Sequence, residues 1–321
     1  MRHGWAIWML CLALGVLARG SSADAAATNL WFPVGEKLTY TVAWGFINVA
    51  ECCITSEWIN EDGRDLIAIR LRNRSNSFLD KIFPVDDFME SVVDPATFVP
   101  LRFTKKLSEG RYRLHEVTTF DHQNKTAHWK HLLKDKQSDF AIDSDTRDLL
   151  SFMYFMRAQK FQMNSNYQFR VMADEKLYEL LVTPAGIETF DIDGFGDVRS
   201  MKVDPEAKFQ GLFVRVGRLQ AWISDDARYL CTKAMAKTPF GSVKLYIHKV
   251  EGPGDDFWTH PGDTNYLQST SYVWTTTSPS TAVALAASDL PTQDQAGAVV
   301  TGGLTGTQSE SGAVAIKEKE E

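Results

Sequence analysis

Two histidines and two acids are the residues best suited to do chemistry in this chain. His128 and His131 lie three residues apart and could share a metal ion, and the adjacent Asp225 and Asp226 could share a proton or bind calcium. In a strand, however, positions three apart point to opposite faces, and aspartates commonly cap their own backbone in turns. We therefore favour solvent-facing histidines and a structural turn, and we predict no metal site and no cofactor.

Hydrolase signatures are missing from the sequence. It contains no G-x-S-x-G nucleophile elbow, no H-E-x-x-H and no phosphate-binding loop. A hydrolase would need an unrecognised acid and histidine site, for instance one built on Asp226 or His128. The sequence names no catalytic residue and favours a non-enzymatic protein.

A polar set with a spacing of three is the most informative candidate. Asp148, Ser151, Tyr154 and Arg157 would be neighbours on a helix, so Asp148 could bond Ser151 and Arg157 could fold back over Tyr154. These groups could tie a helix to a sheet, or they could rim a cavity. The structural role is the one we favour.

One helix is predicted between long stretches of strand. It begins near Asp148, a capping candidate, continues through apolar residues at helical spacing and ends near Arg157 and Lys160. From Glu36 to His131, apolar and polar residues alternate between turn signals about ten residues apart. Later strands are predicted at Tyr167–Met172, Lys176–Val182, Phe209–Val214, Arg218–Ser224 and Ser242–Val250, with breaks at Pro184, Gly194–Gly196, Asp204–Pro205 and Pro239–Gly241.

This order predicts a mainly β fold: a single strongly curved antiparallel sheet, or a partly open barrel, with one packed helix. Curling lets a large sheet bury its own face and protect its edges. Apolar residues of the strands and helix could then line a concave cavity and contact a lipophilic or amphipathic ligand. The predicted ligand-binding set is Tyr40, Trp44, Phe103, Asp148, Ser151, Phe152, Tyr154, Met156 and Arg157. Alternatively these side chains fill the core, and the protein is an envelope scaffold or interaction module.

Both ends of the chain differ from the middle. Residues 1–27 have the basic start, the apolar run Trp5–Ala18 and the A-x-A pattern of a signal peptide, which predicts a periplasmic or secreted protein with no transmembrane span once this peptide is removed. Residues 28–258 form the predicted β domain. Residues 259–321 are rich in Thr, Ser, Ala and Gly and are predicted to be a disordered tail.

The charge and the cysteines narrow the choice of partners. The chain carries a net charge of -7, which argues against nucleic acid and anionic lipid surfaces as partners. The remaining candidate partners are a lipophilic ligand and an envelope protein. Cys52, Cys53 and Cys231 cannot all pair within one chain; Cys231 could bridge to one of the other two, but three free thiols are the simpler interpretation.

Several short motifs occur in an order that resembles a known bacterial family. They are Gly35–Tyr40 (GEKLTY) with Trp44-Gly45, Asp94-Pro95 with Pro100–Phe103, Asp148–Ser151 with Tyr154 and Arg157, Trp222–Arg228 (WISDDAR), and Gly241–Val243. Over about residues 32–250 the chain resembles the family called domain of unknown function 3108. The resemblance implies an exported, mostly β, envelope-associated protein and implies no established activity. Cys231 stands where the resemblance leads us to expect a proline.

Overall fold

The first half of the chain is an antiparallel meander in which each strand pairs with the next. The computed structural model describes residues 27–173, 175–209, 212–214, 219–238, 241–253 and 274–277. Apolar and polar residues alternate along these strands, so one face of the meander is buried and the other is wet. The meander consists of β2 (Lys37–Trp44), β3 (Ile47–Glu61), β4 (Arg64–Ser75), β5 (Asp86–Val93), β6 (Pro100–Glu109), β7 (Tyr112–Asp121), β8 (Thr126–His131) and β9 (Lys136–Ala141), with a short 3-10 helix η1 (Leu79–Lys81) between β4 and β5.

The second half adds strands to the other side of β2. These are β10 (Arg147–Asp148), β11 (Tyr167–Ala173), β12 (Lys176–Ile192), β13 (Gly196–Phe209), β14 (Leu212–Val214), β15 (Leu219–Ser224), β16 (Cys231–Thr238) and β17 (Gly241–Glu251). In the described residues sixteen strands form one sheet, which runs from β10 through β17 and β2 to β9, with β14 beside β13. All pairs are antiparallel except β10 with β11.

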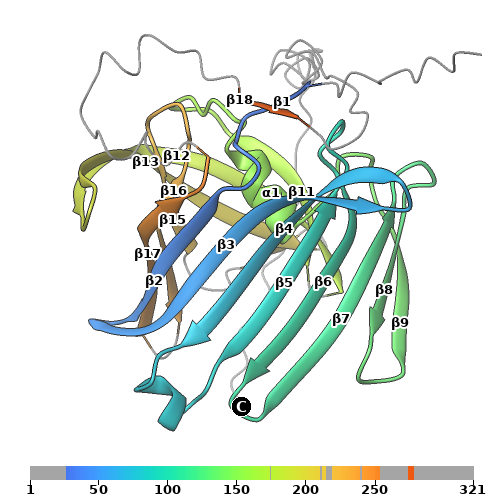
Figure 1. Cartoon of the computed structure of the whole chain (residues 1–321), viewed down its shortest axis with the longest axis horizontal. Coiled ribbons are helices and arrows are strands. Elements are labelled where there is room, and N and C mark those ends of the chain that lie inside the picture. The colour runs from blue at the N-terminus through green and yellow to red at the C-terminus, as the bar shows by residue number, and fades with distance from the viewer. Residues whose placement is uncertain are drawn as a thin grey trace, which may run out of the picture. The chain divides into compact units, whose positions relative to one another are not determined.

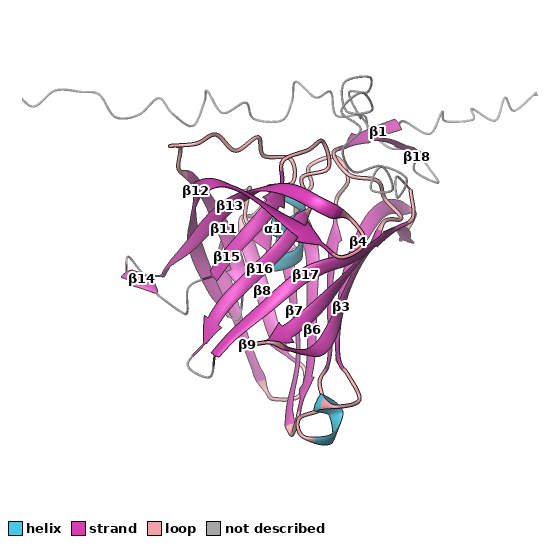
Figure 2. Ribbon diagram, turned by 90° about the vertical axis from the view of Figure 1, so that its left-hand side faces the viewer, coloured by secondary structure: helices cyan, strands magenta, loops and turns pink. Residues whose placement is uncertain are grey.

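The sheet curves around the helix α1 (Leu149–Met156), as Figures 1 and 2 show. The helix contacts β4 and β5 of the meander as well as β10 and β11 at the far edge. The edge strands β9 and β10 do not pair with each other, so the sheet stays open. A single curved, mainly β sheet with one packed helix is therefore confirmed.

Two predicted breaks are wrong, because strands run through both prolines. Pro184 lies inside β12 and Pro205 inside β13. A proline cannot donate a backbone hydrogen bond, but each of these two has a paired strand on one side only. Beyond Val182 of β12 the pairing with β11 has ended, and Pro205 falls between the stretches of β13 that pair with β15 and with β14. A bulge between Pro184 and Gly186 absorbs the irregularity.

Other differences concern strands that the pattern did not indicate. β16 was not predicted, since its apolar positions are mostly alanines and give a weak alternation. The predicted strand Phe209–Val214 spans the end of β13 and the separate β14. No strand was predicted within residues 259–321, yet β18 (Trp274–Thr277) pairs with β1 (Ala27–Leu30) in a two-stranded sheet. Residues 1–26 and the remainder of 259–321 lie outside the described residues.

The buried residues form two apolar clusters, one on each side of α1. The larger lies between the helix, the meander and the segment before β2, and it contains Phe32, Ile67, Ile69 and Leu230, all fully buried. The smaller packs Phe152 and Met156 of α1 against β11, β12, β13 and β15. The helix therefore packs against apolar side chains of both clusters.

The three described cysteines are free thiols, which confirms the simpler interpretation. Burial raises the pKa of Cys52 and of Cys231 to about 12, so both stay protonated at neutral pH. They are packing residues.

Candidate functional site

A fully buried aspartate starts α1 and ties it to the sheet. The Asp148 carboxylate accepts hydrogen bonds from the backbone N–H of Leu150 and Ser151 at 2.8 and 3.0 Å, and the Ser151 hydroxyl accepts one from the Asp148 N–H at 3.1 Å. The second carboxylate oxygen accepts a hydrogen bond from Ser91 of β5. Burial is the main cause that raises the pKa of Asp148 to about 6. The predicted Asp148–Ser151 pair is thus a reciprocal helix cap.

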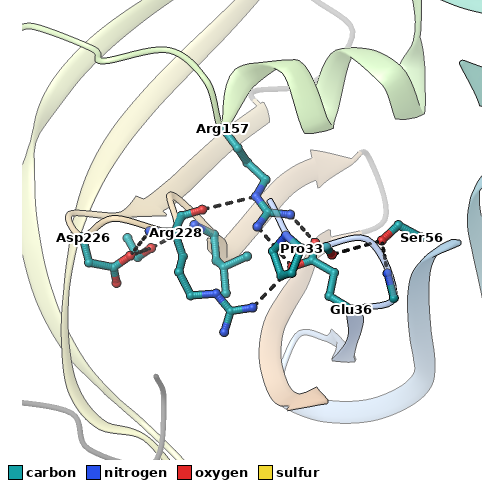
Figure 3. A network of polar contacts seen from close by, with 9 residues as sticks. Pro33, Glu36, Ser56, Arg157, Asp226 and Arg228 are labelled. Atoms are coloured by element: carbon teal, nitrogen blue, oxygen red, sulfur yellow. Dashed lines mark hydrogen bonds and ion pairs between the residues drawn. The ribbon is translucent and has the colours of Figure 1, made fainter. Parts of the chain in front are cut away.

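At the other end of α1, Arg157 enters a buried ionic network (Figure 3). Its guanidinium binds both carboxylate oxygens of Glu36, with Nη2 at 3.2 Å from Oε2, and its Nε donates to the carbonyl of Arg228 at 3.2 Å. Arg228 donates from Nη2 to the same Glu36 oxygen at 3.3 Å. One buried carboxylate is therefore shared by two buried guanidinium groups.

Three separate segments supply this network. Glu36 precedes β2, in a segment that Ser56 of β3 fixes: Gly35 N–H donates to the Ser56 carbonyl at 2.9 Å, and Ser56 N–H donates to the Glu36 carbonyl at 3.2 Å. Arg228 follows β15 in a turn where Asp226 accepts from the Arg228 N–H at 2.8 Å. The network thus joins Arg157, at the end of the helix, to Glu36, which lies 121 residues earlier in the chain, and it joins Glu36 to Arg228, 192 residues later.

The electrostatics identify the network as a structural tie. Burial tends to lower the pKa of Arg157, but the Glu36 carboxylate outweighs it and the pKa is raised. For Arg228, burial prevails and the pKa is lowered. Two cations with one anion would be costly in a dry interior unless their donors were satisfied, so the geometry has to be held firmly. Because the charges of Glu36, Arg157 and Arg228 are engaged with one another, the network is suited to holding their three segments in fixed positions.

Aromatic rings surround this network. Phe32 packs edge-on against Tyr154 at 4.6 Å and against Phe98 at 5.6 Å between ring centroids, and Trp31 donates from Nε1 to the Tyr154 carbonyl at 2.7 Å. The Arg157 guanidinium lies 5.1 Å from the centre of the Tyr154 ring, as predicted. The segment before β2 therefore fills the space between α1 and the sheet.

The structure brings together part of the predicted ligand-binding set. Asp148, Ser151, Tyr154 and Arg157 all lie on α1 or at its ends and are buried. Tyr40 and Phe103 are buried in the larger cluster, while Phe152 and Met156 belong to the smaller one. Trp44 is 49% exposed at the end of β2, away from the others.

Sequence reasoning missed Glu36, Arg228 and Ser91. The signal for the first two was present, because Glu36 and Arg228 each lie in one of the motifs that carried the family resemblance, as does Arg157. Three motifs scattered along the chain thus meet in one salt-bridge network. Ser91 had no comparable signal.

Away from α1, the inner face of the sheet becomes less buried. The cross-strand neighbours Ile69 and Ser91 are 0% exposed, whereas the next row towards the β4–β5 loop, Leu71 and Met89, is only partly buried. The same row continues with Lys105 and Glu116, whose charged atoms are 3.9 Å apart. Trp129 donates from Nε1 to Glu116 at 3.1 Å. This row combines apolar and charged side chains.

The remaining candidates, the two histidines and the two adjacent aspartates, each have a separate role. His128 pairs with Asp139 at 2.7 Å on the surface, as predicted. The prediction of a solvent-facing side chain is wrong for His131, because the alternation of β8 places it on the buried side beside Trp129. Asp225 pairs with Arg199 at 2.8 Å and Asp226 caps the turn, as predicted. Among the described residues no three His, Cys, Asp or Glu side chains are grouped to hold a metal ion. No helix within the described ranges is long and apolar enough to cross a bilayer.

The fold and the network define an open, barrel-like β domain whose helix is anchored by a buried carboxylate between two arginines. Residues 39–248 match the family model described as protein of unknown function (DUF3108), and the chain belongs to this family. None of the curated proteins matches it.

Two solved structures are similar in fold. One is a β-barrel-like protein of domain of unknown function DUF1849 from Brucella abortus, 11% identical, with a TM-score of 0.46, covering 68% of this chain and 97% of its own. The other is a putative exported protein with a YmcC-like fold from Bacteroides fragilis, 6% identical, with a TM-score of 0.31, covering 70% of this chain and 100% of its own.

Proposed function

We propose that this protein is exported to the cell envelope and binds an amphipathic molecule, without catalysis, on the inner face of its sheet. The observation that carries the proposal is the change along that face from fully buried apolar side chains to a row of partly buried apolar side chains beside a charged pair. Apolar Leu71 and Met89 lie beside Lys105 and Glu116 in one cross-strand row. An apolar wall with a few placed charges is typical of sites that hold a molecule with a tail and a polar head.

The predicted ligand-binding set has a different part in this proposal. Tyr40 and Phe103 border this cross-strand row through their strands. Asp148, Ser151, Tyr154 and Arg157 hold α1 across the other half of the face. The helix then closes one end of the site. Export is supported by the signal-peptide pattern of residues 1–27.

A fluorescent naphthylamine probe, whose emission rises in apolar surroundings, tests the site directly. We expect the protein to bind it, and we expect Met89→Trp to weaken binding about tenfold by filling the row. Ile187→Trp on β12, where Ile187 is 42% exposed, is the matched control and should bind as the wild type does. Thermal unfolding of each variant shows whether the fold is kept.

A scaffold with a filled core is the second candidate, and the packing around Glu36 favours it. Phe32, Glu36 and Leu230 are 0% exposed, so this half of the inner face leaves no room for a ligand. Mass spectrometry of an organic extract of the purified protein separates the two functions. If no apolar molecule is found and the probe does not bind, the scaffold function replaces the proposed one.

A further inference from the structure

Exposed apolar side chains gather on four connections at one end of the meander. Because β2 to β9 pair in sequence order and antiparallel, the β2–β3, β4–β5, β6–β7 and β8–β9 connections all lie at the same end, the lower end in Figure 1. Of the thirteen large hydrophobic side chains that are exposed in the described residues, nine lie there: Trp44, Phe46, Ile47, Phe78, Ile82, Phe83, Tyr112, Leu132 and Leu133. We call these connections the hairpin rim.

The first three connections of the hairpin rim contact one another. Asn76 donates from Nδ2 to the Asn48 carbonyl at 2.6 Å, which joins the β4–β5 connection to the start of β3, next to the β2–β3 turn. Gly110 N–H donates to the Pro84 carbonyl at 2.8 Å, and the Phe83 ring lies so close to Gly110 that a Cβ there would approach it to 2.7 Å. These three connections therefore form one continuous surface, on which Phe46 and Ile82 are 100% and 71% exposed.

The charge of the rim differs from that of the whole chain. Residues 44–48, 76–85, 109–113 and 132–136 contain five basic and three acidic residues, in a chain of net charge -7. Asp80, one of the three acids, accepts a hydrogen bond from Ser75, and burial raises the pKa of Glu109, another. Lys81, Arg111 and Lys134 are exposed beside the apolar tips, and Lys244 Nζ lies 5.7 Å from the centre of the Phe46 ring.

We propose that the hairpin rim docks on the surface of an anionic phospholipid bilayer. Apolar tips gain free energy by entering the region between headgroups and acyl chains, and basic side chains behind them bind lipid phosphates. Trp44 and Tyr112 are the residue types that favour this boundary. The excess of basic residues on the rim matches the charge of an anionic bilayer, whereas two copies that met rim to rim would bring like charges together. The docking does not depend on the proposed ligand.

Flotation with lipid vesicles tests the proposal. The purified full chain should bind vesicles of phosphatidylethanolamine with phosphatidylglycerol, and added salt should weaken that binding. The double variant Phe46→Ser, Ile82→Ser should bind at least about tenfold more weakly, because each substitution removes a large apolar contact with the membrane. Ile187→Ser is the matched control. All variants carry the same termini, so any contribution of residues 1–27 is equal among them.

Arg111→Glu with Lys134→Glu tests the charges separately. This variant should lose most of its preference for phosphatidylglycerol over phosphatidylcholine and should unfold at the wild-type temperature. Equal vesicle binding by the double-serine variant and the wild type would overturn the proposal, as would a lack of binding to every vesicle. Self-association of the wild type that the serine substitutions abolish, without vesicle binding, would instead make the rim an interface between copies. Probe binding to the inner face is measured without vesicles, so the two proposals can fail independently.

Discussion

The two ends of the inner face of the sheet differ in how deeply their side chains are buried. Around α1 the face is closed by Phe32, Glu36 and the arginines of the network, and even charged groups there are buried. Towards the hairpin rim, the inner apolar side chains Leu71 and Met89 are only partly buried, and large apolar residues such as Phe46 and Ile82 lie in solvent. The sheet therefore has one closely packed end around α1, which we call the rigid end, and another end, at the hairpin rim, where apolar surface is exposed to solvent.

This difference separates stability from binding. Buried polar groups hold a fold only if every partner is in place, so the α1 end should tolerate few changes. Exposed tips contribute little to folding, because their side chains have few partners to lose. We expect substitutions at the α1 end to change the free energy of unfolding, and substitutions at the rim to change binding alone.

The largest effect is expected at Glu36. Glu36→Gln removes the carboxylate that Arg157 and Arg228 share, and with it the negative charge that it provides to both buried guanidinium groups. Breaking a buried pair of this kind costs about 3–5 kcal/mol. Urea unfolding followed by tryptophan fluorescence should show this loss, or the variant should fail to fold.

Glu251→Ala is the matched control for this substitution. Glu251 also receives two cations, Lys37 at 3.0 Å and Lys249 at 2.9 Å, but on the surface. Exposed ion pairs contribute about 0–1 kcal/mol. If Glu36→Gln cost no more than Glu251→Ala, the network would not be the anchor of α1 and the contrast between the two ends would fail.

Features of this fold that depend on residues close together in the sequence could be predicted, and features that depend on the pairing of distant strands could not. The helix, its Asp148 cap and the meander from β2 to β8 follow from local periodicity, and the structure has them where the pattern places them. The last strand of the meander, β9, was not predicted. The strands through Pro184 and Pro205 do not follow, because only the pairing of neighbouring strands shows that those positions lack a second partner. At these two positions, strand pairing in the folded protein outweighs the local preference of proline for a turn.

For the candidate site, the sequence predicted the two residue pairs of the helix but not the buried carboxylate of Glu36 or its second partner, Arg228. Asp148 with Ser151 and Arg157 with Tyr154 are three residues apart, so helical geometry alone brings them together. Glu36 and Arg228 approach Arg157 only when the sheet curves, which no local pattern contains. A single sequence cannot tell that an ordinary Glu in the segment before β2 is fully buried.

An intermediate effect, one that depends on pH, is expected at Asp148. Because burial raises the pKa of this carboxyl to about 6 from an ordinary 3.8, the folded protein binds the proton more tightly than the unfolded chain. The stability that the protonated group contributes is complete below about pH 4 and is lost as pH rises through about 6. A shift of this size corresponds to about 3 kcal/mol.

Asp148→Asn isolates this contribution, since an asparagine also caps helices but does not titrate. We expect the free energy of unfolding of the wild type to fall by about 2–3 kcal/mol relative to the variant between about pH 4 and pH 7. Urea titrations at several pH values measure the difference. A difference that stays constant across this range would mean that Asp148 is ionised in the fold at acid pH, with Ser91 and the helix N–H groups outweighing its burial.

The smallest effect is expected from removing residues 259–321, which include β18. The deletion takes away one four-residue strand, paired only with β1, and a segment rich in Ser, Thr, Ala and Gly. The deletion leaves the large sheet, both apolar clusters and the Glu36 network in place. We therefore expect the free energy of unfolding, measured by thermal unfolding, to fall by no more than about 1 kcal/mol. Trp274→Ala in the full chain separates the strand's one aromatic ring from the remainder of the segment. If the deletion lowered the melting temperature by many degrees and Trp274→Ala reproduced it, β18 would have to be counted as part of the rigid end.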